Sequence, residues 1–390
     1  MDTTARGGIL KNKNVLALGW VSLLNDFASE MAYPIIPIFL TATLGAPVAA
    51  VGLIEGAAEA TASILKVFSG WLSDRLRNRK GFVAAGYVLG SAAKVLLGFA
   101  ASWTAVLGAR FMDRFGKGIR TAARDALIAD STDAGSRGAA FGLHRAMDTV
   151  GAIIGPLTAL LLLAIVNNNY PLIFLIASIP AFFGVGVLVM FVREPHHDVR
   201  QTPLPLSLSL SQFGAPFRRF LLVSLLFTLG NSSDAFLILR SQSLGYSTQT
   251  TVLLYVLLNC VYSLLSYPFG RLADRFGGKR VLTASLFLFA AVYAGFAAAG
   301  QKEWLCLLFP AYGVFMAMNE GVGKAYIAEL VPAGTRGTAI GFFYTATGLV
   351  TFFSSLIAGI LWSYAGIPSP FYFGAGLSAL AGFIFWILKK

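Results

Sequence analysis

The sequence predicts an all-α membrane protein with twelve transmembrane helices, and three observations support this fold class. Hydrophobic residues make up 56% of the chain and charged residues only 12%, with a mean hydropathy of +0.72, which is too apolar for a soluble domain. The apolar residues form long runs separated by short polar breaks, and about 20 such residues span a hydrocarbon core of about 30 Å. A charged motif that begins at Gly70 also recurs 200 residues later, where its second copy begins at Gly270.

The apolar runs define the expected helices in order along the chain. The first six cover 15–40, 48–72, 82–102, 104–128, 139–165 and 170–192. The second six cover 218–240, 249–270, 280–300, 304–330, 338–363 and 369–388. Two equal sets of six helices follow from this division.

The long polar stretch 193–217 separates the two sets and is interpreted as a cytoplasmic linker. We therefore expect an N-terminal six-helix bundle over 1–192 and a C-terminal six-helix bundle over 218–390. Lys and Arg concentrate after the second, sixth and eighth helices and at the C-terminus, so the positive-inside rule places both termini in the cytoplasm. We expect the chain to lie in the inner (plasma) membrane. Topology thus explains the net charge of +12, and we expect no nucleic-acid partner.

An internal repeat links the two sets of helices. A glycine, an Asp-Arg pair and a basic cluster follow the second helix and recur after the eighth. The residues of this gating motif are Gly70, Asp74, Arg75 and Lys80 in the first copy and Gly270, Asp274, Arg275 and Arg280 in the second. The motif resembles the signature of the major facilitator superfamily, over the whole chain. The resemblance implies two six-helix bundles related by a pseudo-twofold axis, with the motif favouring one gate state.

The fifth helix carries a second motif, formed by Gly151, Gly155 and Pro156. It resembles a glycine-proline motif in the same helix of the family's drug and proton antiporters, which implies export. The alternative interpretation is a small-residue packing face with a proline kink, which is common in membrane bundles.

The fourth helix carries charged residues at steps of three or four, which form one stripe along one face. The stripe consists of Arg110, Asp113, Arg114, Lys117, Arg120 and Arg124. Because each charge at the centre of a membrane helix costs about 2.5 to 3.5 kcal/mol, the stripe must line a cavity or meet partners. Acids inside the first six spans balance the bases in number, with Arg120, Arg124 and Asp125 set aside as helix-end residues, so the stripe does not establish an anionic substrate. A static salt-bridge network is the alternative to a functional role.

Acidic residues of the first two helices are the candidates for proton coupling: Asp26, Glu30, Glu55 and Glu59. A carboxyl group whose neighbours change between two conformations can take up and release a proton. Pro34 and Pro37 allow the first helix to bend beside its acids.

The family resemblance implies a substrate cavity lined by helices 1, 4, 7 and 10. The charged residues expected to line it are Arg110, Asp113, Arg114 and Lys117, together with Asp148, Asp234, Arg240, Glu320 and Lys324.

These observations favour a secondary transporter that exports a small amphiphilic or polar compound in exchange for protons by alternating access. A proton-coupled importer of a small solute remains open. A membrane enzyme is disfavoured because the spans show no nucleophile beside a histidine and an acid and no metal-ligand spacing, and a non-transporting sensor would need a cytoplasmic domain. We expect no catalytic residues, metal or cofactor beyond the proton gradient, and a monomer whose partners are its substrate and the lipid bilayer.

Overall fold

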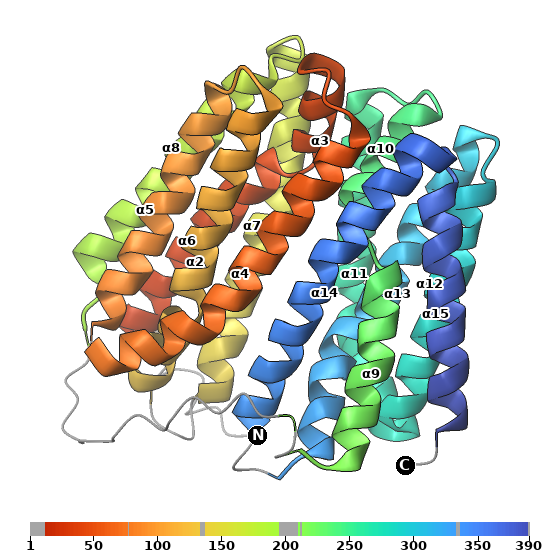
Figure 1. Cartoon of the computed structure of the whole chain (residues 1–390). Helices are drawn as coiled ribbons and strands as arrows, with labels where there is room; N and C mark the ends of the chain where they lie inside the picture. Colours follow the sequence, from red (N-terminus) through yellow and green to blue (C-terminus); the bar gives the residue numbers. More distant parts are fainter. Residues whose placement is uncertain are drawn as a thin grey trace. The chain divides into compact units, whose positions relative to one another are not determined.

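The computed structural model describes residues 12–76, 78–132, 137–194, 210, 213–332 and 336–388, and these residues form an α-helical protein (Figure 1). The helices of the first half are α2 (Lys13–Ala32), α3 (Ile36–Ile38), the π-helix η1 (Phe39–Thr43), α4 (Val48–Leu76), α5 (Arg79–Gly98), α6 (Trp103–Asp130), α7 (Arg137–Ile165) and α8 (Tyr170–Phe191). Those of the second half are α9 (Ala215–Gly230), α10 (Ala235–Ser243), α11 (Thr248–Phe276), α12 (Gly278–Ala298), the short 3₁₀ helix η3 (Lys302–Trp304), α13 (Leu305–Leu330), α14 (Arg336–Ala365) and α15 (Ser369–Ile387).

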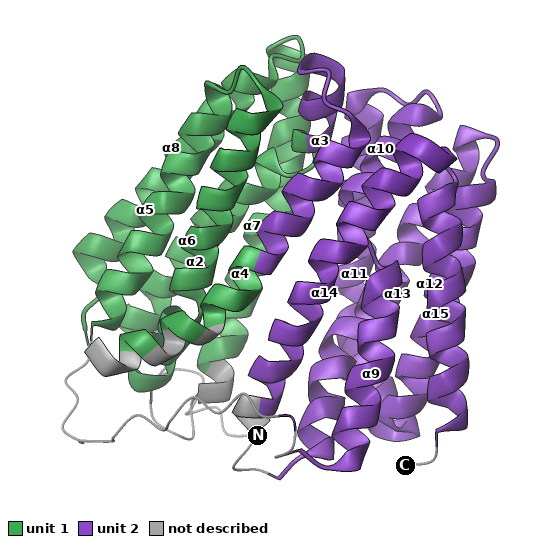
Figure 2. Ribbon diagram, viewed as in Figure 1, with its two compact units in different colours: residues 1–36, 61–206 green, residues 37–60, 207–390 purple. Residues whose placement is uncertain are grey.

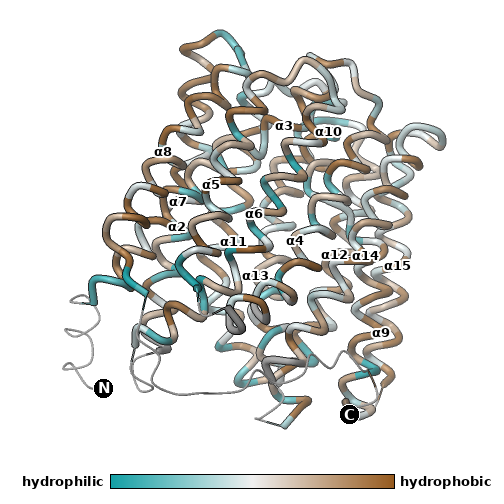
Figure 3. The backbone as a smooth tube through the Cα atoms, turned by 60° about the vertical axis from the view of Figure 1, so that its left-hand side comes forward, coloured by the Kyte–Doolittle hydropathy of each residue, from teal (hydrophilic) through white to brown (hydrophobic). Residues whose placement is uncertain are grey.

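Ten helical segments within the described residues are long and apolar enough to cross a membrane, and α9 with α10 forms one of them. Helices α2 and α6 complete the expected twelve: they are as long as the others but carry charged residues within their length. Figure 3 shows hydrophobic residues along most of each helix, with hydrophilic positions between them. The predicted fold class is confirmed, and the helices begin and end within a few residues of the predicted limits.

Two crossings are interrupted at corresponding places in the two halves. The first crossing ends its regular helix at Ala32 and continues after a turn at 33–35 as α3 and η1. Prolines at 34 and 37 account for this break because they lack the N–H group that a helix needs. The seventh crossing is broken between Gly230 and Ala235, where Asp234 and its three predecessors leave the helix.

The chain divides into two compact units (Figure 2): 1–36 with 61–206, and 37–60 with 207–390. The first half of α4 thus belongs to the second unit. Its glycines explain the packing, because a Cβ atom on Gly52 would lie 2.2 Å from the carbonyl oxygen of Ser355 in α14, and one on Gly56 would lie 2.7 Å from that of Phe352. Only glycine permits such close backbone approach.

The same helix pairs pack in both units, as the sequence repeat requires. In the first unit α5 packs against α6 and α8, and α2 packs against α7 and α8. In the second unit α12 packs against α13 and α15, and α9 packs against α14 and α15. The third, fourth and sixth crossings of each half therefore meet in the same way.

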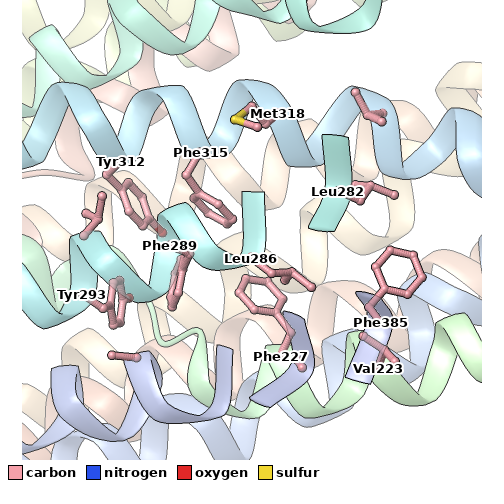
Figure 4. Close-up of a cluster of buried hydrophobic side chains, with 14 of the residues drawn as sticks. Val223, Phe227, Leu282, Leu286, Phe289, Tyr293, Tyr312, Phe315, Met318 and Phe385 are labelled. Atoms are coloured by element: carbon pink, nitrogen blue, oxygen red, sulfur yellow. The ribbon is translucent and has the colours of Figure 1, made fainter. Parts of the chain in front are cut away.

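The core of the second unit is rich in aromatic side chains (Figure 4). Phe289 of α12 stacks on Tyr293 with ring centroids 3.9 Å apart and meets Phe315 of α13 edge-on at 4.8 Å. Phe227 of α9 completes this contact with Phe289 at 5.0 Å. These rings join α9, the first part of the broken seventh crossing, to α12 and α13.

Candidate functional site

The glycines of the fifth-helix motif hold α7 directly against α2. A Cβ atom on Gly151 would lie 2.4 Å from the carbonyl oxygen of Leu23, and one on Gly155 would lie 2.6 Å from that of Phe27. Pro156 follows within the helix. The motif therefore provides a backbone-to-backbone contact, which is the packing role that the sequence left open beside the antiporter interpretation.

This contact brings together two carboxyl groups that lie 122 positions apart (148 − 26) in the sequence. Asp26 of α2 and Asp148 of α7 lie close enough to interact directly. The hydroxyl of Ser22 donates to Oδ1 of Asp148 at 2.5 Å, and Nη1 of Arg145 lies 3.2 Å from Oδ2 of Asp148. An ionised carboxylate has no donor, so a hydrogen bond between two carboxyl groups requires one shared proton.

Charged residues surround this carboxyl pair on several sides. Glu30 and Lys117 act electrostatically on Asp26, and Arg124 acts on Asp148. Two predicted proton-coupling residues, Asp26 and Glu30, thus lie together with two predicted cavity residues, Lys117 and Asp148.

The charged stripe of α6 faces the protein interior, and none of its six residues is exposed. Nζ of Lys94, from α5, lies 3.3 Å from Oδ1 of Asp113, and Nη1 of Arg110 lies 3.9 Å from Oδ2 of Asp113. Arg114 and Arg120 also act electrostatically on the Asp113 carboxylate. An ion cluster between α5 and α6 therefore contains Lys94, which was not among the site residues predicted from the sequence.

Arg120 lies within α6 rather than at its end, and its side chain is buried, with an exposed fraction of 5% for the residue. Its interpretation as a helix-end residue is wrong, because α6 continues to Asp130. Its guanidinium group stacks on the ring of Tyr87 at 4.6 Å. The signal available in the sequence was the unbroken spacing of three to four residues from Arg110 to Arg124.

The other two proton-coupling candidates, Glu55 and Glu59, do not belong to the same unit as Asp26. Glu55 and Glu59 belong to the part of α4 that packs in the second unit, where Glu55 is buried with an exposed fraction of 2%. The four acids are thus distributed over both units.

The second-half candidates occupy three different environments. Asp234, at the break of the seventh crossing, accepts a hydrogen bond from the hydroxyl of Tyr312 at 2.8 Å. Arg240 donates to the carbonyl oxygens of Phe296 at 3.0 Å and Ala299 at 2.7 Å, so it caps the C-terminal end of α12.

Glu320 and Lys324 of α13 are exposed. Glu320 accepts a hydrogen bond from the hydroxyl of Tyr262, and Nζ of Lys324 lies 5.6 Å from the ring centroid of Tyr344. Both residues therefore meet tyrosines of neighbouring helices, whereas Arg240 meets backbone carbonyl groups.

The gating motif is described in part. The contacts of Gly70 and the side chains of Asp74 and Arg75 lie outside the described residues. Lys80 donates from its backbone to Glu194 at 2.6 Å and from Nζ to the carbonyl oxygen of Val189 at 3.0 Å.

Glu194 falls within the predicted linker, but it caps the N-terminus of α5 by also accepting from the backbone of Arg79 at 3.0 Å. The Arg79 side chain forms an ion pair with Asp130 at the end of α6. These contacts fasten the ends of α5, α6 and α8 in the first unit.

In the second copy of the motif, Asp274, Arg275 and Arg280 are exposed at the junction of α11 and α12. A Cβ atom on Gly270 would have no described neighbour within 4 Å. The turn between the two helices is made by Gly277, whose φ of 91° favours glycine. The guanidinium of Arg275 lies 5.3 Å from the ring centroid of Phe276.

A cavity of about 270 Å³ lies elsewhere in the second unit, between the starts of α9 and α12 and the ends of α13 and α15. Arg219, Lys279 and Glu329 contribute charged groups to its wall. Its wall contains none of the site residues predicted from the sequence.

Comparison with known proteins identifies the family. The model of the Major Facilitator Superfamily matches residues 18–262 and 221–390. An uncharacterized MFS-type transporter of Methanocaldococcus jannaschii is 37% identical over 379 residues, covering 96% of this chain and 94% of that protein. A protein of Cupriavidus pinatubonensis named "Probable 4-methylmuconolactone transporter" is 26% identical, covering 90% and 83%.

Solved structures show the same fold. The nucleoside transporter NupG has a TM-score of 0.78 at 16% identity, with 97% of this chain and 100% of that chain covered. A D-xylose-proton symporter has a TM-score of 0.76 at 15% identity, with 97% and 98% covered. This chain is therefore a multi-pass membrane transporter of the major facilitator superfamily.

Proposed function

We propose that this transporter is a secondary active transporter that exports a small polar or amphiphilic compound in exchange for protons. The observation that carries the proposal is the proximity of the carboxyl groups of Asp26 and Asp148, with Ser22 and Arg145 bonded to Asp148. A pair of carboxyl groups that shares one proton can release it when the two groups separate or when a cation approaches.

The surroundings of the pair suit such an exchange. Lys117 of α6 faces Asp26, and Arg145 contacts Asp148 at 3.2 Å. Movement of α2 against α6 or α7 during alternating access would change the distance from each carboxyl group to these cations. The proton affinity of the pair would then differ between the two conformations of the transporter, as coupling requires.

The direction and the substrate class rest on resemblance. The Gly151, Gly155 and Pro156 motif is similar to that of antiporters and favours export, and the name of the Cupriavidus pinatubonensis relative favours a small organic compound. The Lys and Arg distribution favours cytoplasmic termini and the plasma membrane.

The test uses everted membrane vesicles in which a panel of small organic compounds is screened for transport driven by an imposed pH gradient. We expect uptake into everted vesicles when their interior is acidic, because that movement corresponds to export from the cell. Uptake only with the opposite gradient would identify an importer.

The matched variants are Asp26→Asn, Asp148→Asn and the control Glu303→Gln, which removes an exposed acid of η3. The first two should lose pH-driven transport yet keep exchange of labelled for unlabelled compound without a gradient, whereas the control should keep both. If both Asp variants retained pH-driven transport, proton exchange at this pair would be refuted.

A further inference from the structure

Several buried polar side chains of the first unit have atoms without a hydrogen-bond partner in the described part of the chain. Among them are Asn25 of α2 at Oδ1, Tyr87 of α5 at its hydroxyl and Arg120 of α6 at Nε and Nη1. Their exposed fractions are 2%, 1% and 5%. A buried polar atom without a hydrogen bond lowers the stability of the folded protein. Two such atoms on one arginine are unusual in a protein core, where most buried polar atoms are hydrogen-bonded.

Arg120 and Asn25 approach Gly90 of α5 together with the Asp113 carboxylate. A Cβ atom on Gly90 would lie 3.5 Å from Nη1 of Arg120, 3.9 Å from Oδ1 of Asn25 and 3.4 Å from Oδ1 of Asp113. The Arg120 guanidinium stacks on the ring of Tyr87 at 4.6 Å. The absence of a side chain at residue 90 thus leaves the polar groups of α2, α5 and α6 facing one another.

The neighbouring carboxylate is already engaged by other cations. Asp113 is 3.3 Å from Nζ of Lys94 at one oxygen and 3.9 Å from Nη1 of Arg110 at the other. Arg120 forms no ion pair within 4.0 Å in the described residues. Arg120 therefore shares the Asp113 carboxylate electrostatically with other cations, among them the buried Lys94, without forming a close ion pair to it.

We propose that Asn25, Tyr87, Gly90 and Arg120, here called the Gly90 site, bind an anionic oxygen group, a carboxylate or a phosphate. Nε and Nη1 of Arg120 and the hydroxyl of Tyr87 donate to it, and the amide of Asn25 offers its NH₂ group after a half-turn. The inference rests on the proposed function in one respect: it makes the transported compound an organic anion, with a free inorganic anion as the other source of the same chemistry.

The first experiment measures thermal unfolding of the purified protein and of Arg120→Gln in detergent while sodium phosphate or sodium benzoate is titrated. Non-specific effects of ionic strength act equally on both proteins. We expect Arg120→Gln to unfold at a higher temperature than the wild type without added anion, because it removes an unpaired buried charge. We expect the anion to raise the unfolding temperature of the wild type alone, with binding weakened about tenfold or more in the variant.

A purely structural arginine gives the opposite result. If Arg120 only packs on Tyr87, Arg120→Gln unfolds at a lower temperature than the wild type, and neither anion distinguishes the two proteins. That outcome overturns the site.

The second experiment compares Gly90→Ala with Gly108→Ala. The added methyl group at residue 90 would make only ordinary contacts of 3.4 to 3.9 Å, so the protein should fold, but it would occupy the space between the donors. Residue 108 of α6 is exposed and has nothing within 4 Å of the added carbon, so this variant controls for the change in helix propensity. Gly90→Ala should lose the stabilisation by anions, and Gly108→Ala should keep it. Equal stabilisation of both variants would contradict the site.

Transport in the everted vesicles separates the two sources and the two proposals. If an organic anion competes with a transported compound, and Arg120→Gln abolishes this competition, the ligand of the site is the anionic group of the substrate. If phosphate stabilises the protein but no organic anion competes with transport, the ligand is a free anion. Anion binding without pH-driven transport refutes the proposed coupling and keeps the Gly90 site. pH-driven transport without any anion effect refutes the Gly90 site and keeps the coupling.

Discussion

The contact between Gly151 and Leu23 allows a quantitative test of how α2 and α7 hold the carboxyl pair. In Gly151→Ala the new carbon would lie 2.4 Å from the carbonyl oxygen of Leu23, whereas ordinary contact begins at 3.4 Å. The difference, 3.4 − 2.4, means that the two helices must separate locally by about 1 Å. Overpacking of this kind destabilises a protein by about 1–3 kcal/mol.

The same displacement acts on the proton site, because Asp148 lies three residues before Gly151 on α7. The hydrogen bond from Ser22 to Asp148 measures 2.5 Å and would lengthen to about 3.5 Å, which is the outer limit of a hydrogen bond. The interaction between Asp26 and Asp148 crosses the same interface. We therefore expect Gly151→Ala to reduce pH-driven transport as well as stability.

The matched control is Gly142→Ala, a substitution on the same helix at an exposed position with nothing within 4 Å of the added carbon. It should leave transport unchanged and raise stability by at most about 1 kcal/mol, since alanine is the better helix former. The assay is thermal unfolding of the purified variants together with pH-driven transport in vesicles. Equal unfolding temperatures for Gly151→Ala and Gly142→Ala would refute the close-contact argument.

Three further outcomes follow from the geometry and the motifs. Asp113→Asn should lower the free energy of unfolding by about 3–5 kcal/mol because it strands buried cations, and adding Lys94→Gln should restore part of that loss; no restoration in chemical denaturation would show that the two residues are not coupled. Arg240→Gln should cost about 1.5–3 kcal/mol through lost charge-assisted bonds to the end of α12, and reduced transport at an unchanged unfolding temperature would instead favour a substrate contact. Asp74→Asn should impair transport while membrane expression stays near wild type, and unaltered flux would contradict a gating role for that residue.

The number and positions of the helices could be predicted from the sequence because a membrane strongly constrains the secondary structure of each segment that crosses it. Every crossing needs a long helix whose backbone groups are bonded internally, so apolar runs predict crossings almost one by one. The break in the first crossing could also be anticipated, since Pro34 and Pro37 lie at the point where α2 ends. The break of the seventh crossing around Asp234 has no proline and was not predicted.

The sequence identified candidate site residues by their amino-acid type and position in a span, but it did not identify the residues that they contact. A buried charge in a span is unusual enough to single out Asp26, Asp113 and Asp148 from the sequence. Which residue each one meets depends on the rotation and separation of whole helices. Gly151 sets that separation for α2 and α7, and its effect appears only when the opposing backbone is in place.

The sequence by itself therefore determined that this protein has twelve crossings, two repeated halves and a charged interior, because composition, periodicity and repeats are properties of the chain. Its transporter function was implied by the resemblance of the repeated motif to a known family. Only the tertiary structure decided that Asp26 lies beside Asp148, that Arg240 caps α12, and that Arg120 lies buried beside Tyr87. Those relations join residues on different helices, and the energy of a buried charge depends on its neighbours within a few ångströms rather than on its own identity.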